Sequence, residues 1–170
     1  PIGMLCAVML KHAGASQIFI SDVAEKRLEA ARELGMIPVN PLKEDLEAVV
    51  KAATDGEGCD VFFECSGAAA AAVQMTDVTR VRGKICMVSV HKQPHEVNLR
   101  DVNFKEQTLV GTRVYTKDEF GQAVELTQRI SDELELLISH VLPLSDCANV
   151  FDMIHDPQVP TVKVMVDCRR

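Results

Sequence analysis

Two features near the N-terminus could together bind a dinucleotide. Pro1-Ile2-Gly3 leads directly into an apolar, helix-forming stretch. A helix that starts at a glycine turn presents free N–H groups and the positive end of its dipole to a pyrophosphate. Asp22 ends the next apolar run, and an acidic residue about 20 residues beyond such a turn can bind both ribose hydroxyls and repel a 2′-phosphate. The spacing therefore favours NAD over NADP.

Asp22 has a second interpretation that its spacing leaves open. Ser21-Asp22 stands just before the helical stretch 24–34, and short polar side chains commonly cap helices at such positions. Two later strand ends, Ser66-Gly67 and Ser89-Val90, favour binding, because open α/β sheets hold their ligands at the carboxyl ends of strands. Gly and Ser also end strands simply as turn residues. A binding site depends on these ends converging at one edge of a sheet.

The elements that would position these residues alternate along the chain. Short apolar runs predict strands, and stretches with helical spacing predict the helices between them. The predicted strands are 17–21, 36–39, 59–64, 84–90, 108–111, 137–141 and 161–167, and the predicted helices are 4–12, 24–34, 43–54, the Ala-rich stretch from 68, 117–131 and 145–155. This alternation predicts an α/β fold with a doubly wound parallel sheet and right-handed crossovers.

Composition argues against several other classes of protein. A net charge of −7 gives no electrostatic basis for binding nucleic acid. No apolar run approaches the ~20 residues of a membrane-spanning helix. No segment is typical of a signal peptide, so we expect a cytoplasmic protein. Its six cysteines include no CxxC pair, and we expect reduced thiols, with no disulfides and no cysteine-rich zinc site.

Several motifs, in their order and spacing, resemble one enzyme family. They are the initial P-I-G, then I-S-D-x-x-x-x-R-L, G-C-D-V-F-F-E-C-S-G, G-K-I-C-M-V-S-V and K-E-Q-T-L-V-G-T. Together they resemble the zinc-type medium-chain alcohol dehydrogenases, and most closely the branch of sorbitol, threonine and butanediol dehydrogenases. The resemblance extends from Pro1 to about Asp167.

The resemblance implies how the chain is organised. Such enzymes have an N-terminal catalytic domain that holds zinc, followed by a Rossmann-type nucleotide-binding domain. This chain would then be the NAD-binding half, beginning inside the phosphate-binding turn and lacking the first strand of the sheet. Residues 1–136 would form the dinucleotide-binding domain. Residues 137–170 would form a short C-terminal appendage, a return segment towards the absent catalytic domain.

The resemblance also implies roles for residues near the N-terminus. Ile2 and Gly3 would lie against the pyrophosphate. Asp22 would hold the adenosine ribose, and Arg27 would flank the adenine side. Arg27 has an equally plausible alternative as part of a solvated helix face, because Glu25 and Glu29 are its neighbours on that helix.

The remaining implied cofactor residues lie at later strand ends. The Cys-Ser pair after 59–64 would border the cofactor, and the three residues that end 84–90 would present backbone to the nicotinamide end. The Thr-Arg pair after 108–111 would complete that pocket, although its arginine could equally be a surface residue. These residues are Cys65, Ser66, Val88, Ser89, Val90, Thr112 and Arg113.

We expect no catalytic or metal-binding residue in this chain. The family's zinc ligands and proton relay belong to the N-terminal domain, so the chain by itself would be catalytically incomplete. His91 and His95 have the i, i+4 spacing of a metal pair, but Pro94 between them argues against a helix. Two loop histidines are the better interpretation.

Substrate, assembly and competing functions remain open from the sequence. An alcohol or polyol substrate is implied, but the polyol enzymes tend to have Arg before the tyrosine that matches Tyr115, and here that residue is Val114. A homo-oligomer is expected through edge pairing near Thr108–Thr112. The place of the missing first strand could be filled by Val162–Val166 or by a strand from a second copy. The alternatives are a stand-alone nucleotide-binding regulatory module and a zinc-free quinone reductase relative.

Overall fold

Short parallel strands alternate with helices through most of the chain. The computed structural model describes residues 1–156 and 158–169. These residues form two compact units. One consists of Pro1, Gly3–Asn40 and the chain from Thr116 onward, and the other consists mainly of Pro41–Tyr115.

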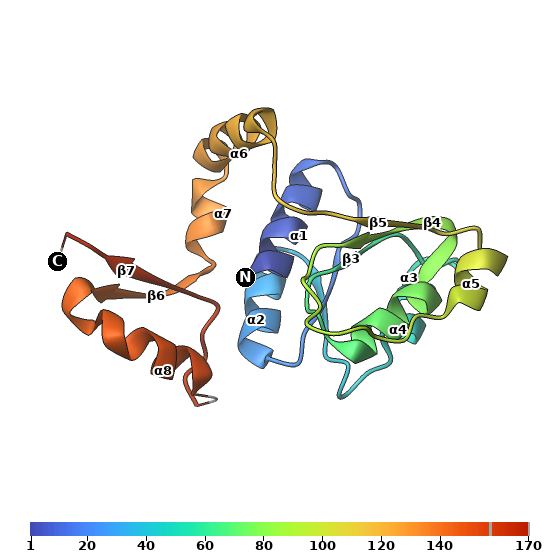
Figure 1. The fold of residues 1–170 in the computed structure, drawn as a ribbon, viewed down its shortest axis with the longest axis horizontal. Helices are drawn as coiled ribbons and strands as arrows, with labels where there is room; N and C mark the ends of the chain where they lie inside the picture. Colours follow the sequence, from blue (N-terminus) through green and yellow to red (C-terminus); the bar gives the residue numbers. More distant parts are fainter. Residues whose placement is uncertain (157, 170) are drawn as a thin grey trace. The chain divides into compact units, whose positions relative to one another are not determined.

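The first unit begins with four elements and ends with six more. They are α1 (Ile2–His12), β1 (Phe19–Ser21), α2 (Glu25–Glu33) and β2 (Ile37–Val39), then α6 (Lys117–Arg129), α7 (Ser131–Glu135), β6 (Ile138–Pro143), the 3-10 helix η1 (Leu144–Asn149), α8 (Val150–His155) and β7 (Lys163–Asp167). Figure 1 shows α8 beside the β6–β7 pair. Buried side chains of α1 and α2 share one core with Ile130, Leu137 and Val162, so the C-terminal segment is packed into this unit.

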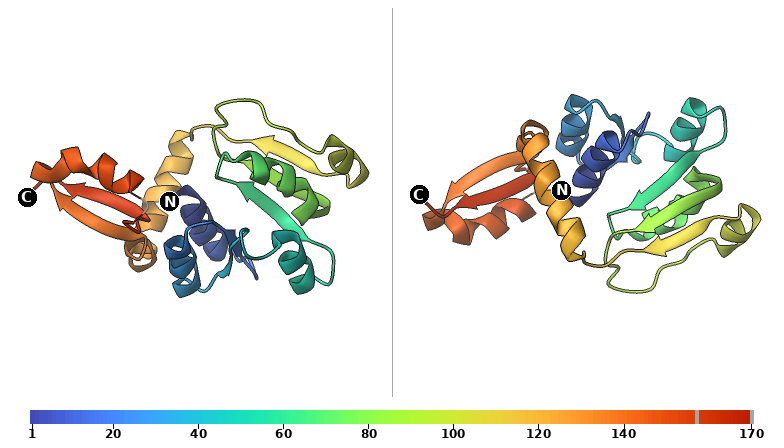
Figure 2. Two further views of the ribbon diagram at one scale, coloured as in Figure 1. Left: turned by 90° about the horizontal axis from the view of Figure 1, so that it is seen from below. Right: turned by 90° about the horizontal axis from the view of Figure 1, so that it is seen from above.

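The second unit is a parallel three-stranded sheet with helices packed against it. Its elements are α3 (Leu46–Ala53), β3 (Cys59–Glu64), α4 (Ala69–Val78), β4 (Thr79–Met87), α5 (Leu99–Phe104) and β5 (Thr108–Gly111). Figure 2 shows the three strands running in the same direction. Helix α4 packs on β3 and β4, and Met75 and Val78 of this helix are buried, as the apolar face of a packed helix should be.

All strand pairs are parallel, which confirms the predicted fold class. The described strands form the pair β1–β2, the sheet β3–β4–β5 and the pair β6–β7. The Rossmann sheet has the strand order 3-2-1-4-5-6. The pair β1–β2 corresponds to strands 2 and 3 of that order, and the sheet β3–β4–β5 corresponds to strands 4, 5 and 6. Strand 1 of that order has no counterpart among the described strands. The suggestion that Val162–Val166 takes the place of strand 1 was wrong, because β7 pairs with β6.

Strand β4 differs most from its prediction. It was expected over 84–90 and is observed over Thr79–Met87. The pairing with β3 shifts register near its start, where Arg82 has a φ of 57°. At Gly83 a Cβ atom would lie 2.4 Å from Thr79 Cγ2, so glycine permits the bulge that lets the strand begin early. Val88, Ser89 and Val90 therefore lie in the loop after β4.

Helix α5 was not predicted. It has six residues, and its N-cap is Asn98, whose side chain accepts a hydrogen bond from Asp101 N. Its short sequence has too few turns for helical periodicity to appear. Gln107 follows it and donates from Nε2 to the carbonyls of Thr76 (2.9 Å) and Thr79 (2.8 Å). This amide satisfies the end of α4 at the edge of the sheet where the strands begin.

Two further features concern the membrane and the cysteines. No helix of residues 1–156 and 158–169 has the length and apolar character that crossing a membrane requires. No disulfide joins the six cysteines, all of which the structure describes.

Candidate functional site

Asp22 lies directly after β1 and closes a turn into α2. Its backbone N–H donates to Val39 O (3.3 Å), which extends the pairing with β2. Its Oδ1 accepts from Ala24 N (2.9 Å), and Ala24 is the residue that precedes α2. The N-cap of α2 is Ala24, and the described residues provide no side-chain cap there. The carboxylate of Asp22 therefore stabilises the turn before the helix but does not cap it, contrary to the second interpretation of the sequence. It also stays 24% exposed, which leaves it accessible to a ligand.

Arg27 forms an ion pair with Asp22. Its Nη1 lies 3.1 Å from Oδ2 and 3.3 Å from Oδ1 of the carboxylate. Nearby, Glu25 accepts from Asn40 and Glu29 accepts from Lys26. An ionised carboxylate offers about four acceptor positions, and the turn and the arginine already use three. One position on Oδ2 and a rearrangement of the arginine would admit ribose hydroxyls.

The start of α1 presents backbone N–H donors. Its N-cap, Pro1, offers no side-chain hydrogen bond, and its first turn contains no acidic residue. Ile2 is exposed and Gly3 is partly buried. The first N–H groups of a helix have no partner within the helix, so this end is compatible with an anionic group such as a pyrophosphate.

Glu64, the last residue of β3, is the most buried acidic side chain of the second unit. Its side chain is 0% exposed. Its Oε1 accepts from Ser66 N (2.9 Å), Ser66 Oγ (2.6 Å) and Gly67 N (3.0 Å). Its Oε2 accepts from Ser89 Oγ, and His91 Nε2 lies 3.1 Å away. One carboxylate therefore joins the turn after β3 to the loop after β4.

The charge of Glu64 is maintained by these donors. Burial alone would raise the pKa of the Glu64 carboxyl, but the hydrogen bonds from Ser66, Ser89 and Gly67 outweigh burial and lower that pKa below its usual value. The carboxylate is thus ionised at neutral pH. A buried charge with this many donors is stable only while all of them stay in place.

The serine, histidine and glutamate of this cluster do not form a hydrolytic triad. A triad needs the imidazole to bind the serine with one nitrogen and the carboxylate with the other. Here His91 uses Nε2 for both Ser89 (3.2 Å) and Glu64 (3.1 Å), and its buried Nδ1 has no hydrogen-bond partner among residues 1–156 and 158–169. The geometry fixes a loop and offers no route for proton transfer through the ring.

The structure brings several predicted residues of the second unit together. Ser66 and Ser89 meet at Glu64, and the amides of Val88 and Ser89 both donate to Glu64 O (2.9 and 3.0 Å). Gly67 has a φ of 71° and a Cβ there would lie 3.7 Å from Ser89 Cβ, so the turn packs closely on this loop. Cys65 is half-buried at the same turn.

Thr112 continues this edge, whereas Val90 and Arg113 point to solvent. Thr112 N donates to Met87 O (3.0 Å), which extends the β4–β5 pairing by one residue. Val90 and Arg113 are exposed. Val114, next in the chain, has a φ of 62°, which is rare for a β-branched residue.

Sequence reasoning missed Glu64 as a member of the site and treated His91 only as a loop residue. The signal for Glu64 was a charged residue at the end of an apolar strand that is followed at once by Ser and Gly. A buried carboxylate needs donors, and the turn after it supplies them. No local signal pointed to His91, because it is 27 residues away from Glu64 in the chain.

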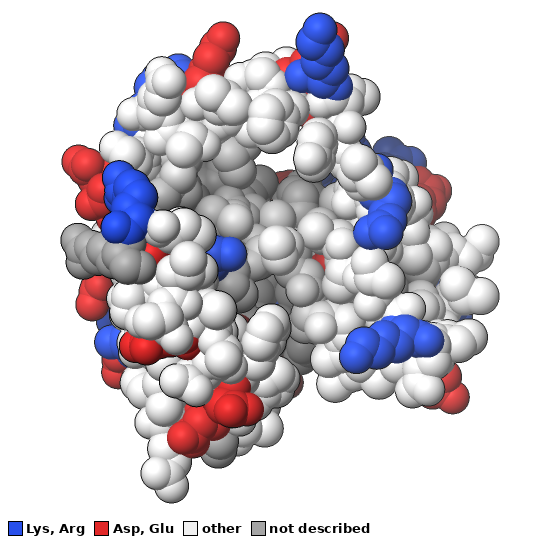
Figure 3. All heavy atoms as spheres, turned by 60° about the vertical axis from the view of Figure 1, so that its left-hand side comes forward, with Lys and Arg blue, Asp and Glu red and all other residues white. Residues whose placement is uncertain are grey.

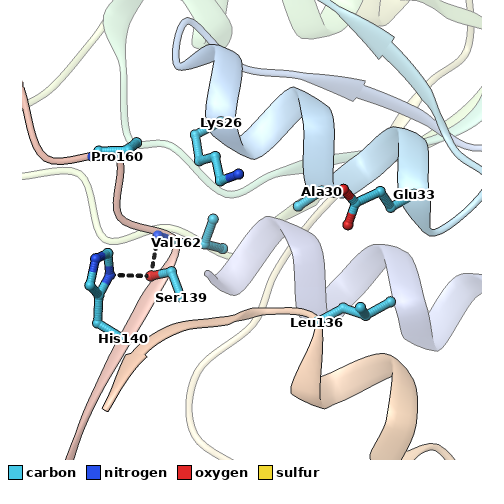
Figure 4. Close-up of a pocket in the computed structure, with 8 residues that line it drawn as sticks. All are labelled: Lys26, Ala30, Glu33, Leu136, Ser139, His140, Pro160 and Val162. Carbon is cyan, nitrogen blue, oxygen red and sulfur yellow. Dashed lines mark hydrogen bonds between the residues drawn. The ribbon is translucent and has the colours of Figure 1, made fainter. Parts of the chain in front are cut away.

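One cavity of the first unit is separate from these residues. It has a volume of about 370 Å³ and lies in the first unit, between α2 and the segment that contains β6. Figure 4 shows Lys26 and Glu33 on one side and Ser139 and His140 on the other. Ser139 Oγ accepts from Val162 N (2.9 Å) and contacts His140 Nδ1. The described lining includes none of the predicted cofactor residues.

The histidines and the charged side chains complete the description of the surface. Within residues 1–156 and 158–169, no group of three or more His, Cys, Asp or Glu side chains could hold a metal ion. His91 and His95 instead meet edge to face, with ring centroids 5.1 Å apart. On the face drawn in Figure 3, basic and acidic side chains are interspersed among uncharged ones.

Comparisons with known proteins point in one direction. The family model described as "Zinc-binding dehydrogenase" matches residues 1–129. A 2-dehydro-3-deoxy-L-galactonate 5-dehydrogenase from Pseudoalteromonas atlantica is 38% identical over 169 residues, which are 99% of this chain and 49% of that protein.

Solved structures agree with this match. The crystal structure of 2R,3R-butanediol dehydrogenase from Bacillus subtilis has a TM-score of 0.86 at 30% identity, covering 98% of this chain and 48% of that one. A zinc-binding dehydrogenase from Sinorhizobium meliloti, bound to NADP, has a TM-score of 0.83 at 25% identity, covering 97% of this chain and 49% of that one. The chain thus spans about half the length of the relatives it matches.

Proposed function

The chain belongs to the zinc-binding dehydrogenase family, and from this premise we propose that it is the NAD-binding half of an alcohol or polyol-type dehydrogenase. Relatives in this family are named dehydrogenases. Residues 1–136 would bind the dinucleotide, and residues 137–170 would form the return segment towards a catalytic domain. By itself the chain would bind cofactor without completing the reaction.

The observation that carries this proposal is the accessible carboxylate at the end of β1. Asp22 can accept hydrogen bonds from ribose hydroxyls, and its charge opposes a 2′-phosphate. Arg27 beside it steadies that carboxylate but is also a group that a phosphate would attract. The NADP-bound relative makes the choice between the two dinucleotides the decisive point, and Asp22 favours NAD.

The other predicted residues would orient the cofactor. The uncapped first turn of α1, with Ile2 and Gly3, would receive the pyrophosphate. The turn after β3 and the loop after β4 would border the nicotinamide end, with Thr112 and Arg113 completing the pocket. Bound NAD supplies the hydride acceptor for alcohol oxidation. The contribution of this chain is to bind and orient, which by itself lowers a barrier substantially.

Zinc does not fit the described residues of this chain. Catalytic zinc needs about three protein ligands that converge on one point, and the described residues provide no such group. We assign the zinc ligands to the part of the full-length protein that corresponds to the other half of the relatives. No step proposed here depends on the metal.

Substrate, assembly and location belong to the same proposal. The relatives named above act on a deoxy-galactonate and on butanediol, as their names state, and an alcohol or polyol substrate fits both. Strand β5 is exposed along its length and, among the described strands, pairs only with β4. Such an edge is suited to pairing with a second copy. The proposal also includes a cytoplasmic location for the full-length protein.

The test is a calorimetric titration of the full-length gene product with NAD and with NADP. We expect NAD to bind and NADP to bind at least about tenfold more weakly, which corresponds to about 1.4 kcal/mol. Asp22→Ala should weaken NAD and narrow the gap between the two dinucleotides. Asp60→Ala, which removes another paired aspartate at 80% exposure, is the matched control and should change neither.

Other outcomes identify the alternatives. Tight NADP binding without NAD binding would support a quinone reductase relative. NAD binding by a full-length protein that oxidises no alcohol or polyol, even with zinc supplied, would support a regulatory module. Binding of neither dinucleotide would contradict the proposal.

A further inference from the structure

The buried carboxylate of Glu64 connects two segments that are separate in the sequence. On one side it holds the turn Ser66-Gly67 through three hydrogen bonds to Oε1. On the other it holds Ser89 and His91 through Oε2. Since β3 and β4 are neighbouring parallel strands, both segments lie at the carboxyl edge of the sheet. The proposed function places the nicotinamide end of the cofactor there.

We infer that Glu64 is a positioning residue, which fixes the turn after β3 and the loop after β4 in the arrangement that binds the dinucleotide. The inference rests on the proposed function. Glu64 itself is fully buried, so it acts through Ser66, Gly67 and Ser89 and makes no contact with the cofactor.

Hydrogen-bond geometry explains why this position needs a carboxylate. A carboxylate accepts in about four directions and donates in none, and here every neighbour is a donor. Ser89 gives its proton to Oε2, and its oxygen can then accept from His91 Nε2, 3.2 Å away. Glu64, Ser89 and His91 are thus joined pairwise by hydrogen bonds, which fixes the position of Ser89. An amide in place of the carboxylate would turn an N–H donor towards Ser89, so that Ser89 Oγ could no longer donate to residue 64.

Backbone hydrogen bonds also hold the loop after β4, but only at its first residues. Val88 N and Ser89 N both donate to Glu64 O, which anchors the first residues after β4. Beyond Ser89 the described backbone makes no such bond to β3, and Val90 is 68% exposed. The side-chain links from Glu64 to Ser89 and His91 therefore extend the ordered region towards the residues expected at the nicotinamide.

The experiment measures the dissociation constant of NAD for the full-length gene product and four variants, at a temperature below the melting point of each. Ser89→Ala keeps the backbone of the loop and removes its hydroxyl. Glu64→Gln keeps the size of the side chain and reverses the polarity of one oxygen. The double variant tests whether both act through the same link. Gln107→Met is the matched control, because it removes two buried hydrogen bonds at the opposite edge of the same sheet.

We expect Ser89→Ala to raise the dissociation constant about tenfold, and Glu64→Gln to raise it in the same direction. The double variant should bind no more weakly than the weaker single variant, since both changes break one link. Gln107→Met should lower the melting temperature while the dissociation constant stays within about twofold, the limit within which distant sites are independent.

Three results would overturn the inference. One is that Ser89→Ala binds NAD as tightly as the wild type. Another is that Gln107→Met weakens NAD as much as Ser89→Ala, since the effect would then follow stability alone. The third is that the two single effects multiply in the double variant. If the wild type binds NAD and one of these occurs, only this inference fails. If the wild type binds neither NAD nor NADP, the proposed function fails first and this inference fails with it.

Discussion

Asp22 and Glu64 are two carboxylates at the carboxyl end of a parallel strand, one in each unit, yet their surroundings differ. Asp22 is partly exposed and its partners are one backbone amide and the cation of Arg27. Glu64 is fully buried and is surrounded by serine, glycine and histidine donors. An accessible carboxylate can exchange its partners for a ligand, whereas a buried one can only hold its neighbours. Asp22 is therefore suited to binding a ligand, and Glu64 to positioning its neighbours.

The largest expected effect is the loss in the free energy of unfolding when the buried carboxylate of Glu64 is removed. Glu64→Leu leaves the buried donors of Ser66, Gly67 and Ser89 without an acceptor, and we expect a loss of at least about 3 kcal/mol. Urea unfolding of the full-length protein measures it, with the exposed Glu96→Leu as control, which should stay within about 0.5 kcal/mol. Equal unfolding midpoints for the two variants would show that the cluster does not stabilise this edge.

Acid should weaken the hydrogen-bonded cluster around Glu64, because the hydrogen bonds to its carboxylate lower the pKa of Glu64 in the folded state. Its contribution to stability is fully present above its unfolded pKa of about 4.3 and is lost as the pH falls through the lower folded value. Melting temperatures between pH 7 and pH 3 should therefore fall more steeply for the wild type than for Glu64→Gln. Parallel curves would mean that Glu64 has the same proton affinity in both states.

The smallest effect is expected at the exposed ion pair. Arg27 is 38% exposed in its pair with Asp22, and such pairs are worth roughly 0–1 kcal/mol. Arg27→Ala should thus shift the urea midpoint little more than Arg32→Ala on the same helix. A loss as large as that of Glu64→Leu would erase the distinction between the two sites.

The sequence predicted the regions where a local pattern is sufficient. Strands 59–64 and 108–111 were located to the residue, because their apolar runs end at turn residues. Asp22 was proposed as a binding residue because its spacing from Gly3 is itself the signal, and that role stays a prediction. The C-terminal elements around β6 and β7 were also visible, although the pairing of β7 with β6 was not, since partner choice between strands is not encoded in either strand alone.

What the sequence did not show depends on contacts between distant residues. Strand β4 begins at Thr79 because a bulge at Arg82-Gly83 restores its pairing with β3, and no apolar run marks that start. Glu64 became part of the site only when Ser89 and His91 were placed beside it. The roles of the predicted cofactor residues stay predictions, to be tested by binding.

The most direct test of the account is a crystal structure of the full-length gene product grown with NAD. We expect the carboxylate of Asp22 to lie within hydrogen-bonding distance of both hydroxyls of the adenosine ribose, at about 2.5–3.0 Å, with the pyrophosphate at the start of α1. A bound dinucleotide whose adenosine ribose lies away from Asp22 would contradict the assignment of this carboxylate as the group that selects NAD.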